Sequence, residues 1–215
     1  MSIIAVFNQK GGVGRTTTAL NVVAAIARRG QRPLAIDLDP QAQLSRFLGT
    51  RPKLASESVC SFFATGRPLP DVAQITRSGI ALCPSHPDLG KVAAALGKGM
   101  SAITLLREAL SNAALSDGAV VIDTPRSLDV MTLNALFACD LLLVPISSDF
   151  LALESAREVE RAVNALEPAM KRRLPRRYLL TRYDDDDMSA RVAAQMASAF
   201  PAETVCATRV RESAD

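Results

Sequence analysis

The chain has 215 residues, of which 48% are hydrophobic and 22% charged, and its net charge is +3. This length suits one sizeable domain and the composition is ordinary for a globular protein, so we expect a single domain over residues 1–215. The longest apolar runs fall short of the roughly 18 residues that span a bilayer, and the N-terminus lacks the basic flank and cleavage site of a signal peptide. These features favour a soluble, cytoplasmic protein and argue against a membrane protein.

The first predicted elements follow one another closely. Ile3–Phe7 is a short apolar run typical of a buried strand, and it leads directly into a glycine-rich loop. Residues Thr16–Arg29 then carry apolar side chains at helical spacing, Gly30 ends that helix, and Pro33–Asp37 reads as a second buried strand.

Strand and helix patterns continue to alternate along the rest of the chain. Further strands are predicted at residues 80–84, 119–123, 141–145 and 178–181, and further helices at 103–115, 128–138, 151–166 and 189–200. The segment Gly49–Gly79 is less regular and reads as an excursion from the sheet. The alternation predicts an α/β fold, a doubly wound, mostly parallel β-sheet flanked by helices.

Charge and cysteine placement exclude some sites and suggest others. The four cysteines lie far apart and His86 is the one histidine, so a protein-ligated metal or iron–sulfur centre is not expected. Asp184–Asp187 reads as a solvated loop whose charge suits the N-terminus of the next helix. Basic residues crowd together between positions 171 and 182, and such a patch can bind phosphate backbones even at a modest net charge.

The loop after the first strand has the composition of a phosphate cradle. Gly11, Gly12 and Gly14 allow backbone N–H groups to close on phosphate oxygens, and the following helix adds its N-terminal dipole. Thr16 is placed to ligate Mg²⁺ and Thr17 to touch an inner phosphate. The sequence therefore predicts a site for ATP and Mg²⁺.

Two acidic strand ends strengthen this prediction. Asp37 and Asp39 follow one buried strand, and Asp123 ends another. In a parallel sheet the carboxyl ends of the strands converge on the ligand crevice. A carboxylate in the position of Asp123 can hold Mg²⁺ through water.

The strict pattern G-x-x-x-x-G-K-[ST] fails twice, because position 9 is Gln and position 15 is Arg. The run from Lys10 to Thr18 instead resembles the deviant Walker A box of the ParA/MinD family of partition ATPases. The similarity extends in order through most of the chain and is closer to ParA than to MinD. Its further motifs are Asn8-Gln9, residues 37–41, 122–125, 132–136, 144–154 and 181–184.

The resemblance implies roles for individual residues. Lys10 matches the signature lysine that reaches the partner's phosphates in an ATP-sandwiched homodimer. Asp37 matches an outer-sphere Mg²⁺ ligand, Asp39 the residue that positions the attacking water, and Asp123 the Walker B aspartate. The implied nucleotide contacts are Gly11, Gly12, Val13, Gly14, Arg15, Thr16, Thr17, Pro145, Thr181 and Arg182.

The family also implies partners. Its members form an ATP-dependent dimer, bind DNA non-specifically and are stimulated by a ParB-like adaptor. Arg211 resembles one of the C-terminal basic residues of this DNA-binding role, with Arg209 as a second candidate, and the role would associate the protein with the nucleoid. The acidic run Asp184–Asp187 opposes it, and the chain ends at Asp215, where relatives continue into a further helical segment. A MinD-type membrane role would need an amphipathic C-terminal helix in place of the polar segment Arg209–Asp215.

Arg15 is the main departure from the family, since it replaces the P-loop lysine. A planar guanidinium in place of a compact ammonium keeps the charge but changes its placement, so hydrolysis is expected to be weak. Arg15, Lys10 and Asp39 are the expected catalytic residues. Three functions stay open: a cycling ATPase that positions DNA or another large cargo, a hydrolysis-poor nucleotide switch, and, less favoured, a metabolic enzyme on the same fold. Arg126 is either a phosphate sensor or a surface residue.

Overall fold

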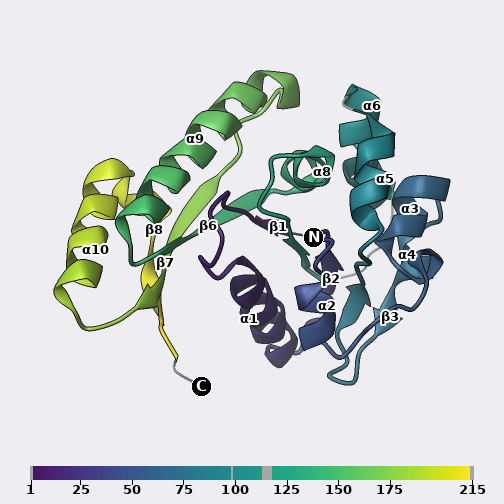
Figure 1. Cartoon of the computed structure of the whole chain (residues 1–215), viewed down its shortest axis with the longest axis horizontal. Helices are drawn as coiled ribbons and strands as arrows, with labels where there is room; N and C mark the ends of the chain where they lie inside the picture. The colour runs from purple at the N-terminus through teal and green to yellow at the C-terminus, as the bar shows by residue number, and fades with distance from the viewer. Residues whose placement is uncertain (1, 98, 113–117, 214–215) are drawn as a thin grey trace.

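The computed structural model describes residues 2–97, 99–112 and 118–213. They form one sheet of eight strands in the order β3-β4-β2-β5-β1-β6-β7-β8, with helices on both faces (Figure 1). Every neighbouring pair is parallel except β3 and β4. The strands are β1 Ile3–Val6, β2 Leu34–Asp37, β3 Gln74–Ile75, β4 Ala81–Cys83, β5 Val120–Asp123, β6 Leu141–Ser147, β7 Arg176–Tyr183 and β8 Val205–Arg211.

Helices form the connections between strands, except at the turn that joins β3 to β4. The α-helices are α1 Arg15–Arg28, α2 Gln43–Phe47, α3 Val59–Thr65, α4 Leu69–Val72, α5 Leu89–Leu96, α6 Met100–Ile103, α7 Leu105–Asn112, α8 Val130–Ala138, α9 Phe150–Met170 and α10 Asp187–Ala199; two 3-10 turns are η1 Ala55–Glu57 and η2 Ala202–Thr204. None of the helices within the described ranges is long and apolar enough to cross a membrane. The predicted α/β architecture with a mostly parallel sheet is confirmed.

The centre of the sheet is buried on both faces. Strands β2 and β5 are fully buried, as their nearly continuous apolar sequences require when helices cover both sides. Ala5 of β1 packs into a large cluster with residues of α8 and α9, whereas Val6 packs into a smaller cluster with residues of α1. Fully burying a large apolar side chain contributes about 1.5–3 kcal/mol, so the two clusters fix the sheet between its helices.

The register of the central strands brings the acidic strand ends together. Val6 pairs with Asp123, and Asp123 pairs in turn with Asp37, so β1, β5 and β2 end at the same level. The loop before α1 therefore lies over the same edge of the sheet as the two buried carboxylates.

Several predicted boundaries differ from the structure. The predicted helix 103–115 is split between α6 and α7, and its residues 113–115 lie outside the described residues. The segment Gly49–Gly79 was expected to lie outside the sheet; it contains α3 and α4 but also β3, which joins the sheet by pairing with β4. Strand β8 was not predicted, because its sequence carries two arginines and it lies at the exposed edge of the sheet. The acidic run behaves as expected: the Asp186 side chain caps α10 by accepting from the Ser189 N–H at 2.7 Å.

Candidate functional site

The loop between β1 and α1 has a backbone that requires glycine. Gly12 and Gly14 have φ angles of 78° and 82°, in the left-handed region that side chains disfavour. Gly14 is also the N-cap of α1, where its carbonyl accepts from the Thr18 N–H at 2.8 Å. The carbonyl of buried Val13 accepts from the Thr181 hydroxyl at 2.8 Å, which ties the loop to β7. The loop thus leads into a helix N-terminus, the geometry that favours anions.

Arg15 folds back onto this loop. Its Nη1 donates to the carbonyls of Lys10 at 2.6 Å and Asn8 at 2.7 Å. Its Nε is buried and has no hydrogen-bond partner among the described residues. Burial lowers the pKa of Arg15, while the nearby carboxylates of Asp123 and Asp39 raise it. Arg15 therefore supports the loop from inside and keeps an unused donor beside the acidic residues.

Asp37 is held by its own loop and by α2. Its Oδ1 accepts from the Asp39 N–H at 3.1 Å, and its Oδ2 accepts from the N–H and the hydroxyl of Ser45 at 2.8 and 2.6 Å. Burial raises the pKa of Asp37 to about 6, and the bonds from Ser45 act against that rise. Asp39 is half-buried and accepts from the Gln41 N–H at 2.9 Å.

Asp123 is the least satisfied polar group of the site. Both of its oxygens are buried without a hydrogen-bond partner within the described part of the chain. Burial and then the neighbouring Asp37 raise its pKa well above the ordinary value; Thr16 lowers it, although no hydrogen bond joins the two. An unpaired buried carboxylate is costly, and a divalent cation is a group that would satisfy it.

The residues around Asp123 fit Mg²⁺ bound together with a phosphate. In residues 2–97, 99–112 and 118–213 no three His, Cys, Asp or Glu side chains are arranged to chelate a metal by themselves. Mg²⁺ ordinarily keeps several waters and takes only one or two carboxylates plus substrate phosphates. Asp123, Asp37 and Thr16 match that requirement.

Lys10 is turned toward α9. Its Nζ lies 2.6 Å from Oδ2 of Asp149, which also accepts from the Ser147 hydroxyl at 2.7 Å. Asp149 is the N-cap of α9, where its Oδ1 accepts from the Ala152 N–H at 3.0 Å. Burial works to raise the pKa of Asp149, but the hydrogen bonds from Lys10 and Ser147 outweigh it and the net shift is downward. In this structure Lys10 is therefore paired within its own chain.

A cavity of about 330 Å³ opens beside the loop. Five of the predicted nucleotide-binding residues line it: Gly12, Gly14, Thr17, Thr181 and Arg182. The other five predicted contacts are not among its lining residues: Gly11, Val13, Arg15, Thr16 and Pro145. Pro145 is buried in β6, where its carbonyl accepts from the Asn8 amide at 2.8 Å, so its connection to the loop runs through Asn8.

The predicted C-terminal basic residues lie near this cavity and are already engaged. Arg211 lines its rim and pairs with Asp185 at 2.8 Å, and Arg182 pairs with Glu212 at 2.6 Å. Arg209 lies over the ring of Tyr183, 4.9 Å from its centroid. The exposed Arg126 is close enough to Arg15 to lower its pKa.

Comparison with known proteins decides the family. Residues 1–175 match the family model described as an AAA domain. The chain is 35% identical over 206 residues to the chromosome partitioning protein ParA of Caulobacter vibrioides, covering 93% of this chain and 77% of that protein. The chain belongs to the ParA family of partition ATPases. It is also 37% identical over 199 residues to the chromosome-partitioning ATPase Soj of Thermus thermophilus, covering 92% and 76% of the two chains.

Solved structures agree with the ParA-family fold. Cobyrinic acid a,c-diamide synthase from Mycobacterium smegmatis, with bound ATP analog and magnesium, superposes with a TM-score of 0.86 at 30% identity, covering 94% of this chain and 83% of that one. A variant of Cyanothece McdA in complex with ATP has a TM-score of 0.89 at 21% identity, covering 99% and 84%. At that identity the second likeness shows the fold alone.

Four polar residues that support the ParA-family site were given no individual role from the sequence. The amide of Asn8 is fixed by Pro145 and by the Ser155 hydroxyl, which donates to its Oδ1 at 2.5 Å. Ser45 holds Asp37, and Asp149 holds Lys10. Asn8 was noted only as part of the resemblance, and nothing in the sequence pairs Ser45, Asp149 or Ser155 with the loop.

Proposed function

We propose that this chain is an ATPase that binds ATP with Mg²⁺ at the loop 10–17, dimerises when ATP is bound, and positions DNA or another large cargo with a ParB-like adaptor. We take residues 1–215 to act as one domain. The observation that carries the proposal is the pair of unsatisfied buried groups in one crevice, the carboxylate of Asp123 and the Nε of Arg15. An unpaired acceptor and an unpaired donor suit a cation and a phosphate oxygen respectively.

Each residue of the crevice has a distinct task in this proposal. The loop N–H groups and Thr17 bind phosphate oxygens, and Arg15 places positive charge beside them. Bound Mg²⁺ would neutralise charge on the phosphates, held by Thr16 and by Asp37 and Asp123 directly or through water. Asp39 orients the attacking water. Thr181 and Arg182 contact the base, with Pro145 behind the loop.

Dimerisation requires Lys10 to exchange partners. In the free chain its ammonium is paired with Asp149. We propose that a second copy brings phosphates within its reach, so that Lys10 leaves Asp149 and binds the nucleotide of the partner. This exchange would couple ATP binding to association. It would also leave Asp149 to cap α9 alone.

Arg15 sets the rate in this scheme. Two of its hydrogen bonds go to loop carbonyls, so its charge is placed for the shape of the loop as well as for phosphate. We propose that turnover is consequently slow. A switch that binds ATP and recruits a partner with little hydrolysis is the second candidate function, because it needs the same crevice and tolerates this placement.

A calorimetric titration with ATP, with and without Mg²⁺, tests the central proposal. We expect binding to depend on Mg²⁺ in the wild type and to lose most of that dependence in Asp123→Asn, which keeps the size of the side chain. Absence of Mg²⁺-dependent uptake of adenine nucleotide by the wild type would overturn the proposal. Basal hydrolysis, measured with and without DNA and candidate adaptors, then separates the cycling ATPase from the switch.

A further inference from the structure

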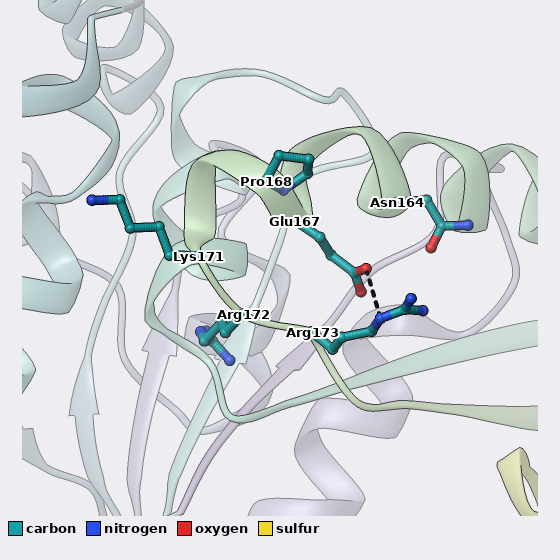
Figure 2. A pocket seen from close by; sticks show the side chains of 6 residues that line it. All are labelled: Asn164, Glu167, Pro168, Lys171, Arg172 and Arg173. Carbon is teal, nitrogen blue, oxygen red and sulfur yellow. Dashed lines mark ion pairs between the residues drawn. The ribbon is translucent and has the colours of Figure 1, made fainter.

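The turn between α9 and β7 is the most basic segment of the chain. Residues 171–177 hold five cations, and three of them, Lys171, Arg172 and Arg173, border an open depression of about 660 Å³ (Figure 2). Strand β7 begins at Arg176 and runs parallel to β6, so this turn lies at the amino edge of the sheet. The loop 10–17 lies at the carboxyl edge. The five cations are Lys171, Arg172, Arg173, Arg176 and Arg177.

Two of the five cations have a structural role. Arg172 donates from Nη2 to the carbonyl of Cys139 at 2.6 Å and that of Phe137 at 3.3 Å, which satisfies the C-terminal end of α8. Arg176 is mostly buried and pairs with Glu167 at 2.5 Å. These two residues are explained by the stability of the fold.

The other three cations are exposed and weakly engaged. The side chain of Lys171 makes no hydrogen bond or ion pair within the described ranges. The side chain of Arg173 is 93% exposed, and its Nε is 3.9 Å from Glu167, whose other oxygen accepts from Arg176 and from the Leu174 N–H. Arg177 reaches only the carbonyl of Arg176, at 3.5 Å. Their charges are therefore available to a partner.

The arrangement of these cations indicates what kind of anion they fit. Figure 2 shows Lys171 and Arg173 extending from the turn in opposite directions, so they do not converge on one small anion. Charges spread along a turn suit an extended chain of phosphates. The turn also lacks an exposed large hydrophobic side chain of the kind that inserts into a membrane; such side chains, for example Phe150 and Leu151, lie elsewhere among the described residues.

We propose that the α9–β7 turn, through Lys171, Arg173 and Arg177, binds the phosphate backbone of duplex DNA. The inference rests on the DNA step of the proposed function and assigns it to a different surface from Arg209 and Arg211. Those two arginines lie near the nucleotide cavity, one paired with a carboxylate and one stacked on a ring. Because the turn is at the opposite edge of the sheet, DNA bound there leaves Lys10 and the crevice open to a second copy.

The experiment compares two triple variants, each of which removes three positive charges, at different places on the surface. The test variant is Lys171→Gln/Arg173→Gln/Arg177→Gln, and the matched control is Arg46→Gln/Arg51→Gln/Lys53→Gln, which removes three exposed cations from another surface. ATP binding is measured first by calorimetry. Retention on unspecific duplex DNA is then measured with ATP across a salt series.

We expect the test variant to bind ATP normally and to lose roughly tenfold or more in DNA affinity at low salt. The slope of log K against log salt should become shallower by about 0.9 for each lost phosphate contact, or about 2 to 3 in total. The control triple variant should change the slope by less than about 0.9, the value expected for one phosphate contact.

Four outcomes would overturn the inference. One is an equal loss in the control variant, which would mean that only net charge matters. Another is a loss confined to Arg209→Gln/Arg211→Gln, which would place DNA at the carboxyl edge. A third is a test variant that keeps DNA but loses phosphatidylglycerol vesicles, which would identify a membrane face. Lastly, wild-type protein that takes up ATP but is never retained on DNA would remove this inference and the DNA step while leaving the nucleotide site standing.

Discussion

The two edges of the sheet use their charges in opposite ways. At the carboxyl edge Lys10 is paired with Asp149, Arg182 with Glu212 and Arg211 with Asp185, and Asp123 is left without a partner among the described residues. At the amino edge the α9–β7 turn carries cations with few carboxylates to meet them. A count of basic residues therefore says little about binding. What matters is which charges the fold has left unmatched.

At the carboxyl edge, removal of the residue proposed to orient water should have the strongest effect on activity. Asp39→Ala should lower ATP hydrolysis by about 100-fold or more, because positioned polar groups at a transferring phosphoryl contribute on that scale. Binding of ATP should persist, and the ATP-bound dimer should accumulate in size-exclusion chromatography with light scattering. Hydrolysis at the wild-type rate would show that Asp39 does not have this role.

A second change examines how the buried acidic residues of the crevice are held. Ser45→Ala removes a 2.6 Å hydrogen bond to the buried carboxylate of Asp37. Hydrogen bonds to charged groups contribute about 1.5–3 kcal/mol, so the affinity for ATP with Mg²⁺ should fall by roughly tenfold or more. Calorimetry at several Mg²⁺ concentrations measures the effect.

Ser85→Ala is the matched control for this change. Its hydroxyl is also fully buried and has no hydrogen-bond partner in the described part of the molecule, while its N–H, which the variant keeps, donates to Ser45. We expect near wild-type nucleotide affinity. Restoration by Ser45→Thr, which returns a hydroxyl, would support a positioning role, and equal losses in both alanine variants would argue against one.

Arg15→Lys tests how the positive charge inside the crevice is placed. A compact ammonium releases the carbonyls of Asn8 and Lys10 and concentrates charge toward phosphate. Turnover should rise several-fold, which corresponds to an activation free energy lower by about 1.4 kcal/mol or less. The change in ATP affinity should be smaller. Single-turnover kinetics separates the two effects. Unchanged or slower turnover would contradict the role given to Arg15.

The smallest expected effect concerns stability and pH. Asp149→Asn keeps a good N-cap for α9 but removes the charge paired with Lys10, and a part-exposed pair of this kind contributes little, so Tm should fall by no more than roughly 2 °C at pH 7. The pKa of Asp149 is lowered from 3.8 in the folded chain, so its contribution is present above that value and is lost as pH falls through the folded pKa. Wild type and variant should therefore converge below about pH 4 in thermal melts. A difference that persists or grows in acid would contradict this origin.

Local sequence patterns predicted the centre of the fold well. Ile3–Phe7, Pro33–Asp37 and Ala119–Asp123 are dominated by apolar residues because helices cover both faces, and each contains an observed strand. Strand β8 escaped prediction because an edge strand with an exposed side tolerates charge. Its place is set by pairing with β7, a strand that lies more than 20 residues earlier in the sequence.

The same distinction applies to the site. Glycine positions and acidic strand ends follow from local backbone geometry and from the convergence of parallel strands, so Gly14, Asp37 and Asp123 could be predicted. The pairs Lys10–Asp149 and Asn8–Ser155 join residues more than 130 positions apart, and only the three-dimensional structure brings them together. For the same reason, the sequence alone does not show which arginines are paired with a carboxylate.

Strand β8 has one further consequence, for handling the protein. It closes the sheet, so its outer side offers backbone groups that another chain could pair with, and charged side chains on such a strand discourage that pairing. Arg209 and Arg211 occupy this position in an otherwise uncharged run. Neutralising both arginines leaves an edge strand that can pair with other chains and aggregate. Samples of that double variant therefore need to be checked by light scattering before a loss of DNA retention is attributed to binding.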